Sequence, residues 1–459
     1  MEAALSNLSN VAQSALQAAA ARARGTMVVN TGDAATGSYH QLLPYVAAAV
    51  VAYPILVHLL RYRGSNALRR RFPYGPEAGK DHKPYSAMTN NEAQAILHRL
   101  SDWEFPTMVL LGLQMALLRT YGIPSISRLL AATRQLGQGD NVGRRYADTS
   151  LIMHEIYANA PDTARSAEAY ARLNYLHGVY IKAGKISNDD LLYVLSLFMY
   201  DPVDAIKLYD WRSLTEMERC AFGVFHHGMG TAMDIDFSPL PSAAAGFRDG
   251  LHFYDELYAW SKAYERAQML PAQSNHDVAV HTVNLIKGDF PAFLHPHVEH
   301  LVYSVFNDRF LAACKFPTPS RAYRLVTRGG FALKRYACRH LLLPRMTPYA
   351  PWRSYDPAED VGPDGRRCFT TYAGLPVYVR PTFWNRWGPE ALYFRLIGKP
   401  LPGDKGMEPE GYLLKDAGPR QHSGKGWDEA ELNAKKLLKM PRGGCPFAVI
   451  SYKAYSHTA

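Results

Sequence analysis

The sequence is poor in cysteine and lacks the common nucleotide-binding motifs. Its five cysteines among 459 residues are odd in number, lie far apart and form no C-x-x-C pair, which argues against a disulfide framework and against a zinc knuckle. The segment GPRQHSGKG (418–426) does not have the G-x-x-x-x-G-K-[ST] spacing of a phosphate loop. We therefore expect reduced thiols and no nucleotide chemistry.

Charged residues are absent between Asp33 and Arg61. As a helix, the 19 residues from Leu42 to Leu60 would be about 28 Å long, which is close to the hydrocarbon thickness of a bilayer. This stretch predicts a transmembrane anchor over residues 41–61. A buried core helix would have a similar composition and is the alternative.

Basic residues cluster directly after this apolar stretch. Residues 61–84 contain seven Lys or Arg and two acidic residues, which accounts for about half of the formal net charge of +10. Basic residues beside a membrane span stay on the cytoplasmic side. We therefore expect a lumenal segment over 1–40 and a basic cytosolic linker over 62–94. We therefore expect these basic residues to contact membrane lipid and not nucleic acid.

These features predict a single-pass membrane protein whose large domain is cytosolic, and the endoplasmic reticulum (ER) is the expected membrane. The first 25 residues are rich in Ala and Ser, contain one acidic residue and end near Arg22 and Arg24. That composition also resembles a mitochondrial presequence. Targeting to the mitochondrion is therefore the alternative.

Beyond the linker the sequence predicts helices. Ser187 and Thr215 each precede an apolar run and are followed three residues later by an acidic residue, as in a capping box. Alternating strand patterns are scarce before residue 360. We predict one helical domain over 95–347 and an irregular extension over 348–459, rich in turn residues, that packs on this domain.

One predicted helix carries a histidine in an apolar stripe. Tyr170, Leu173, Leu176, His177 and Tyr180 recur at helical spacing and so lie on one face. A buried imidazole needs partners for its ring nitrogens, which can be a hydrogen bond, a carboxylate or a metal ion. A core histidine with ordinary hydrogen bonds is the alternative to a ligand.

A second predicted helix, upstream, combines polar and apolar residues on one face. Arg145, Asp148 and Thr149 occupy its first turn, and Ile152 and Met153 continue the same stripe. Polar groups placed in this way must be satisfied inside the protein or must face a cavity. They could also be the solvated start of an ordinary helix. A neutral imidazole is the usual proximal haem ligand. If the two helices face each other across a haem, His177 could be that ligand and these polar residues could form the distal side.

A rival site lies further along the chain. The segment FLHPHVEHL places His295, His297, Glu299 and His300 within six residues. Histidines with a carboxylate can bind non-haem iron or zinc, so a non-haem metal oxygenase is one alternative. Solvent-exposed histidines without a metal are the other.

The two helical segments resemble a family of helical oxygenases that includes the latex clearing protein, a rubber oxygenase, and the ER-bound fungal oxygenase MpaB. Arg145 and Thr149 match an R-x-x-K-T motif on the distal side of the haem of latex clearing protein. His177, in the sequence RLNYLHG, matches the histidine that binds the iron. The lysine position of the motif holds Asp148, which replaces a cation by an anion. The resemblance to the fungal branch covers most of residues 95–425.

The resemblance implies an all-α protein, in which one large helical domain with a globin-like core binds haem b. His177 would be the ligand of the haem iron, and Arg172, little more than one helical turn before it, would pair with a haem propionate or with a structural carboxylate. Arg145 and Thr149 would polarise dioxygen through hydrogen bonds, and Asp148 would relay protons or orient water.

The implied reaction is the O2-dependent cleavage of a carbon–carbon double bond in the prenyl chain of a hydrophobic small molecule, in fungal secondary metabolism. A membrane anchor suits such a substrate because isoprenoid chains partition into the bilayer. The alternative from another class is a non-catalytic, membrane-anchored carrier of a hydrophobic ligand.

Overall fold

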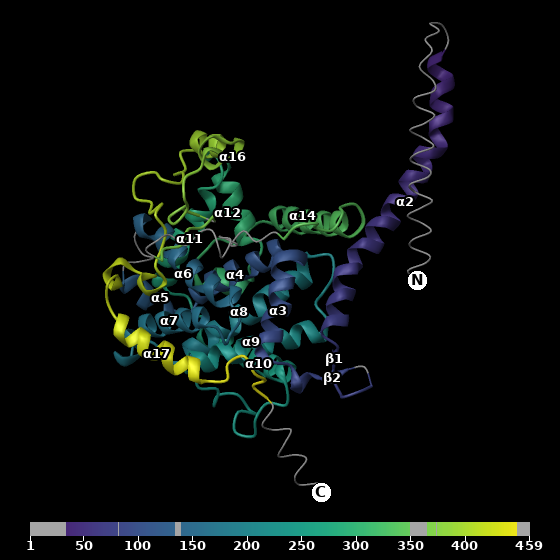
Figure 1. The fold of residues 1–459 in the computed structure, drawn as a ribbon. Coiled ribbons are helices and arrows are strands. Elements are labelled where there is room, and N and C mark those ends of the chain that lie inside the picture. The colour runs from purple at the N-terminus through teal and green to yellow at the C-terminus, as the bar shows by residue number, and fades with distance from the viewer. Residues whose placement is uncertain (1–33, 81, 134–138, 349–364, 373, 448–459) are drawn as a thin grey trace. The chain divides into compact units, whose positions relative to one another are not determined.

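The computed structural model describes residues 34–80, 82–133, 139–348, 365–372 and 374–447 (Figure 1). The chain divides into two compact units, Met1–His58 and Leu59–Ala459. In the described part of the first unit, the chain forms the N-terminal portion of one long helix, α2. All other elements belong to the second unit.

The elements of the described chain, in order, are α2 (Ala34–Arg71), β1 (Tyr74–Gly75), β2 (Lys83–Pro84), η1 (Tyr85–Ala87), α3 (Asn90–Arg99), η2 (Leu100–Glu104), α4 (Pro106–Thr120), α5 (Pro124–Ala132), α6 (Gly139–Ala158), α7 (Ala164–Lys182), α8 (Asn188–Tyr209), α9 (Glu216–Ala232), α10 (Gly250–Gln268), α11 (Gln273–Lys287), η3 (Ala292–Leu294), α12 (His295–Tyr303), α13 (Asp308–Ala313), α14 (Arg321–His340), α15 (Phe383–Trp387), α16 (Pro389–Leu396), η4 (Leu414–Asp416), η5 (Arg420–His422) and α17 (Trp427–Lys439).

The prediction of an all-α fold is confirmed. Within the described residues the only sheet is the parallel pair of two-residue strands β1 and β2. Helix α4 packs along α8, α9 packs against both α3 and α10, and α17 packs on α7. Their buried faces form one continuous hydrophobic core, as expected when amphipathic helices bury their apolar stripes against one another.

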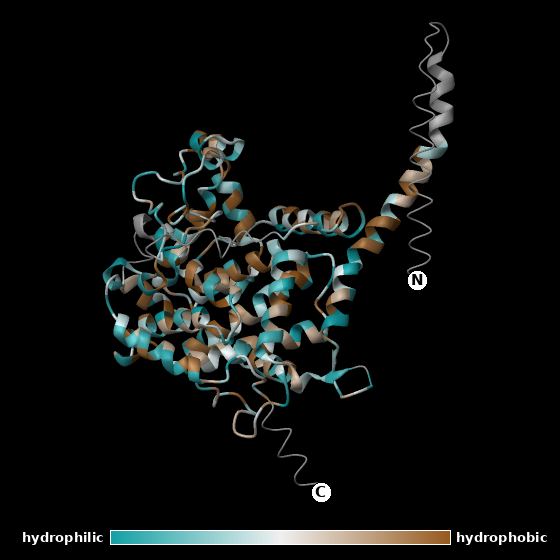
Figure 2. Cartoon of the chain, viewed as in Figure 1, coloured by the Kyte–Doolittle hydropathy of each residue, from teal (hydrophilic) through white to brown (hydrophobic). Residues whose placement is uncertain are grey.

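One apolar helix is long enough to cross a membrane. The segment Pro44–Arg71 of α2 has a mean hydropathy of 1.5 in its most apolar window, and Figure 2 shows the apolar residues along it. Its length and composition agree with the predicted anchor over 41–61. A second candidate, the pair α4 and α5, is bent by 87°. Because α4 packs along α8, we interpret this pair as part of the core.

Two predicted helix starts are present. The Thr215 side chain accepts a hydrogen bond from the backbone N–H of Glu218, and the Glu218 side chain accepts one from the Thr215 N–H, which completes a capping box for α9. The Ser187 hydroxyl accepts a hydrogen bond from the Asp190 N–H at the start of α8. These bonds satisfy backbone donors that have no partner within the helix.

Residues 62–94, expected to be a linker, contribute to the core. Tyr74, Tyr85 and Met88 are buried, and the Tyr74 hydroxyl donates a 2.7 Å hydrogen bond to Glu92. Where α2 enters the second unit, the Tyr62 ring packs edge-on against Trp211, with 5.1 Å between the ring centroids. The basic segment is therefore held on the helical domain.

The α4–α8 contact yields a stability prediction. A Cβ atom at Gly112 would lie 2.3 Å from the Cα of Pro202, which is backbone and cannot move aside, whereas a Cβ at Gly330 in α14 meets nothing within 4 Å. We expect Gly112→Ala to lower the free energy of unfolding by about 2–3 kcal/mol. Gly330→Ala should raise it by about 0.5–1 kcal/mol through helix propensity. Denaturant unfolding measures both, and equal effects would contradict the close contact.

Candidate functional site

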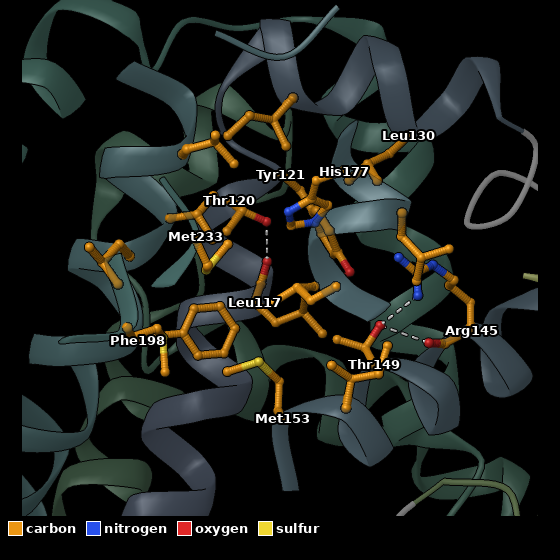
Figure 3. A pocket seen from close by; sticks show the side chains of 18 of the residues that line it. Leu117, Thr120, Tyr121, Leu130, Arg145, Thr149, Met153, His177, Phe198 and Met233 are labelled. Atoms are coloured by element: carbon orange, nitrogen blue, oxygen red, sulfur yellow. Dashed lines mark hydrogen bonds between the residues drawn. The ribbon is translucent and has the colours of Figure 1, made fainter. Parts of the chain in front are cut away.

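An apolar cavity of about 200 Å³ lies between α4, α5, α6, α7, α8, α9 and α11. Most of its wall consists of Leu, Ile, Val, Met and Phe side chains, and Figure 3 shows them pointing into it. The bend between α4 and α5 brings Thr120 and Leu130 to the same cavity. Its polar residues come from distant parts of the chain and are Thr120, Tyr121, Arg145, Tyr146, Thr149, His177 and Thr282.

A second cavity of about 170 Å³ adjoins the first. The two share wall residues that include Arg145, Leu176 and His177. The wall of the second cavity also contains Lys185, Asp190 and His422. His177 and Arg145 therefore lie between two largely apolar cavities, the second of which has more charged residues in its wall.

His177 is a neutral histidine with an unsatisfied ring nitrogen. Its Nδ1 is buried and has no hydrogen-bond partner in the described structure. Burial, with a smaller contribution from the Arg145 cation, lowers the pKa of His177 to about 4. An unpaired buried nitrogen costs free energy unless a ligand satisfies it. The described protein atoms therefore supply no hydrogen bond to this nitrogen.

Arg145 and Thr149 form a polar pair on the α6 face of the cavity. An Nη1–H of Arg145 donates to the Thr149 hydroxyl at 3.1 Å, and this hydroxyl donates to the Arg145 carbonyl at 2.9 Å. Figure 3 shows both bonds beside the cavity that also contains the His177 ring. The spacing of four residues places both side chains on one helix face. The structure thus brings these three predicted site residues together.

Asp148 lies outside both cavities. Its side chain is buried and accepts a 2.6 Å hydrogen bond from the hydroxyl of Tyr378, a residue of the C-terminal extension. Burial raises the pKa of the Asp148 carboxyl, and the Tyr378 hydrogen bond and the Arg144 cation oppose this shift. Asp148 therefore links α6 to the extension, and the structure does not bring it to the cavity with Arg145.

Arg172 also points away from the cavities. Its fully buried guanidinium donates hydrogen bonds to three backbone carbonyls of the extension: Nε to Ala417 at 2.8 Å, Nη1 to Lys425 at 2.9 Å and Nη2 to His422 at 3.0 Å. These bonds hold the segment 417–425, whose His422 lines the second cavity. In the structure Arg172 is a tether for this segment and is not positioned at the cavity to pair with a propionate.

Four polar residues of the cavity have no counterpart in the sequence predictions, namely Thr120, Tyr121, Tyr146 and Thr282. The hydroxyls of Tyr121 and Thr282 are buried beside each other without a hydrogen bond of normal geometry. Burial raises the pKa of Tyr121 to about 12, so it is a protonated donor at neutral pH. The two residues come from the α4–α5 corner and from α11, and no local motif marks either of them.

The other histidines that the structure describes do not assemble a metal site. His226 is satisfied, because its Nδ1 bonds the Phe222 carbonyl and its Nε2 the Tyr157 hydroxyl, both at 2.8 Å. In the proposed rival cluster, His295 bonds the Phe290 carbonyl and Glu299 pairs with Lys287 at 2.6 Å. Within the part of the chain that the structure describes, no group of three His, Cys, Asp or Glu residues could hold a metal ion. The geometry gives no support to the non-haem alternative.

Relatives of this chain are fungal oxygenases. The chain is 36% identical over 409 residues to the ER-bound oxygenase mpaB' of Penicillium brevicompactum, which covers 89% of this chain and 95% of the relative. It is 34% identical over 380 residues to the ER-bound oxygenase mpaB of the same species, covering 82% of this chain and 88% of the relative. The chain belongs to the MpaB family of ER-bound oxygenases.

A further MpaB protein, from Penicillium roqueforti, is 36% identical over 273 residues, covering 60% of this chain and 90% of the relative. No family model matches the chain. The resemblance predicted from the sequence is thus confirmed for the MpaB family. The names of the relatives support an oxygenase that uses O2 and a small-molecule substrate, and together with the apolar α2 they are consistent with anchoring at the ER membrane.

The tether by Arg172 generates a prediction for this MpaB-family protein. Arg172→Ala should lower the free energy of unfolding by about 2–4 kcal/mol, because it leaves one buried and two partly buried carbonyls without their donor. It should also make the segment 417–425 sensitive to protease. Arg172→Lys is the matched control and should recover part of the loss, since an ammonium cannot reach three divergent carbonyls at once. Unchanged protease resistance of Arg172→Ala would contradict the tether.

A second prediction concerns pH. His227 packs against four phenylalanine rings, three of them at centroid distances of 4.9 Å, and burial lowers its pKa from 6.5 to about 4. The unfolded chain therefore takes up this proton first, so stability is lost as pH falls from about 6.5 to about 4. In His227→Phe the loss over this range should shrink by up to about 3 kcal/mol.

Urea unfolding at several pH values measures this difference. The same replacement at the exposed His82 controls for the change of residue type. If His227→Phe loses as much stability between pH 6.5 and pH 4 as the parent does, the buried neutral state of His227 is contradicted.

Proposed function

We propose that this protein is a haem-dependent oxygenase that cleaves a carbon–carbon double bond in the prenyl chain of a hydrophobic substrate. The observation that carries the proposal is the neutral His177, whose buried Nδ1 has no partner and whose ring faces an apolar cavity. Family membership supports the oxygenase class. The haem and the prenyl substrate are inferences from the chemistry of the cavity residues and from the sequence resemblance.

The residues around the cavity fit a haem group. A neutral imidazole is the form that binds iron, and the low pKa of His177 keeps it in that form at physiological pH. The apolar walls suit a flat hydrophobic macrocycle. Lys185 lines the adjoining cavity and would pair with an anionic substituent there, a role for which Arg172 is not positioned. His177 would hold the iron.

Haem supplies, when bound, the O2 chemistry that side chains lack. The Arg145 guanidinium has further N–H groups beyond the one bonded to Thr149, and these would donate hydrogen bonds to dioxygen in the cavity. The Thr149 hydroxyl fixes the guanidinium in that orientation. Pre-oriented donors in a site that excludes water stabilise developing negative charge strongly.

The substrate chain would lie along the apolar wall formed by residues such as Met153, Leu195 and Phe198. Cleavage replaces one carbon–carbon double bond by two carbonyl groups. Both oxygen atoms come from one O2 molecule, so the net reaction needs no external reductant. The buried Tyr121 hydroxyl would donate a hydrogen bond to a polar group of the substrate.

The membrane topology extends the same proposal. The apolar part of α2 would cross the ER membrane once, and the basic residues 61–84 that follow it would keep the helical domain in the cytosol. A substrate dissolved in the bilayer would then be concentrated near the domain. A carrier without catalytic activity would use the same apolar cavity, and the experiment below distinguishes the two.

The full-length protein, solubilised in detergent after expression with ample haem, should have a Soret band. His177→Ala should lose or shift this band, while the exposed control His82→Ala should keep it. Arg145→Ala should keep the band and lose about 10²–10³-fold in turnover of a prenylated substrate under O2. Haem loading without turnover would favour the carrier, and a parent protein without a Soret band would contradict the haem assignment.

A further inference from the structure

Helix α14 contacts the domain through polar side chains and exposes apolar ones. Two basic residues attach the helix to Asp210. Lys334 forms a 2.7 Å ion pair with the buried Asp210 side chain, and Arg335 donates a 2.9 Å hydrogen bond to the Asp210 carbonyl. The Phe331 ring stacks on Tyr209, with 4.1 Å between the centroids. None of the helix residues is fully buried.

The opposite side of α14 presents apolar residues to the outside. Leu325, Val326, Leu333 and Tyr336 are 57–71% exposed, and they recur at helical spacing. We call these four residues the outer face of α14. A helix on the surface of a soluble domain normally turns its apolar stripe inward, so this face requires an explanation. Figures 1 and 2 show the helix at the edge of the domain with both residue classes along it.

The apolar exposure continues beyond the end of the helix. Leu341, Leu342 and Leu343 are 46–53% exposed, and Met346 is 83% exposed. Together with the outer face they form a contiguous stretch of chain in which large apolar side chains meet the surroundings. Exposed apolar patches of this kind indicate an interaction surface for a membrane or a protein.

Charge distinguishes between those two partners. Residues 321–346 contain seven Lys or Arg and no acidic residue. Arg321, Arg328 and Arg339 are exposed and, by their spacing, lie along one edge of the outer face. An apolar stripe bordered by arginines is the pattern of a helix that lies in the interface of an anionic membrane.

The position of the stretch supports the same partner. The Arg61 guanidinium donates a hydrogen bond to the Leu342 carbonyl. Arg61 directly follows the apolar run that ends at Leu60. If that run crosses the membrane, its cytosolic end, and therefore Leu342, lies at the membrane surface. The C-terminal end of α14 is thus bonded to the residue at which the chain would leave the bilayer.

We propose that α14 and residues 341–346 form a second membrane contact, in which the outer face of α14 inserts into the lipid interface parallel to the membrane plane. The contact fixes the orientation of the domain on the membrane, which a single anchor helix alone does not do. We favour a lipid bilayer as the partner of this surface. The outer face of α14, the arginines beside it and the hydrogen bond from Arg61 to Leu342 belong to one part of the domain.

The test uses the full chain in vesicles that contain nitroxide-labelled lipid. A fluorophore is attached at Leu333→Cys, and at Leu432→Cys on α17 as the control, because Leu432 is 72% exposed, close to the 68% of Leu333. The unsubstituted parent is labelled in parallel to correct for its own cysteines. Insertion predicts at least about threefold stronger quenching at 333 than at 432, since interfacial helices sit about 5–10 Å deep.

Two further measurements sharpen the result. Replacing Leu325 by Glu should reduce the quenching of the label at 333, and adding phosphatidylserine to phosphatidylcholine vesicles should increase it because of the arginines. Circular dichroism checks that the variant folds. Equal quenching at 333 and 432 overturns the proposal. Self-quenching between labels at 333 without lipid quenching also overturns it, because the face would then contact a second copy.

Discussion

The attachment of the C-terminal segment 417–425 to the helical domain depends on the buried guanidinium of Arg172. A helical bundle satisfies its own backbone, but the segment 417–425 has little regular structure and needs partners for its carbonyls. The Arg172 side chain on α7 donates hydrogen bonds to three of these carbonyls. Two more buried bonds hold the extension in the same way, from Tyr378 to Asp148 and from Tyr412 to Glu155. The hydrogen bonds of Arg172 therefore hold the segment whose His422 lines the second cavity.

The sequence predicted the helices and the central residues of the cavity because both follow from periodicity. Arg145 and Thr149 lie four residues apart, and Leu173, Leu176 and His177 lie three or four apart, so each set shares a helix face wherever the helix packs. The long apolar helix before Arg61 could be predicted in the same way, since composition and length define a candidate membrane span. The N-cap residue Ser187 and the capping box of Thr215 and Glu218 predicted the starts of α8 and α9.

The remaining positions depended on packing partners that no local pattern reveals. Asp148 precedes Thr149 by one residue, and this turns its side chain by about 100° around the helix axis, toward Tyr378 and away from the cavity. Arg172 is five residues before His177 and is likewise rotated off its face. Tyr121 and Thr282 meet only because α4, α5 and α11 pack together. Residues 62–94 lack a strong helical period, although Tyr74 and Met88 are buried.

The long separation between Arg172 and its partners has a consequence for biosynthesis. Ala417 lies 245 residues after Arg172, and at about 5–20 residues per second the ribosome needs roughly 10–50 s to make that distance. In the later part of this interval, once Lys287 at the end of α11 has been made, all the helices that surround the cavity exist, while the segment 417–425 does not. The nascent domain therefore passes through an open period in which a large ligand can enter from the side that this segment later covers.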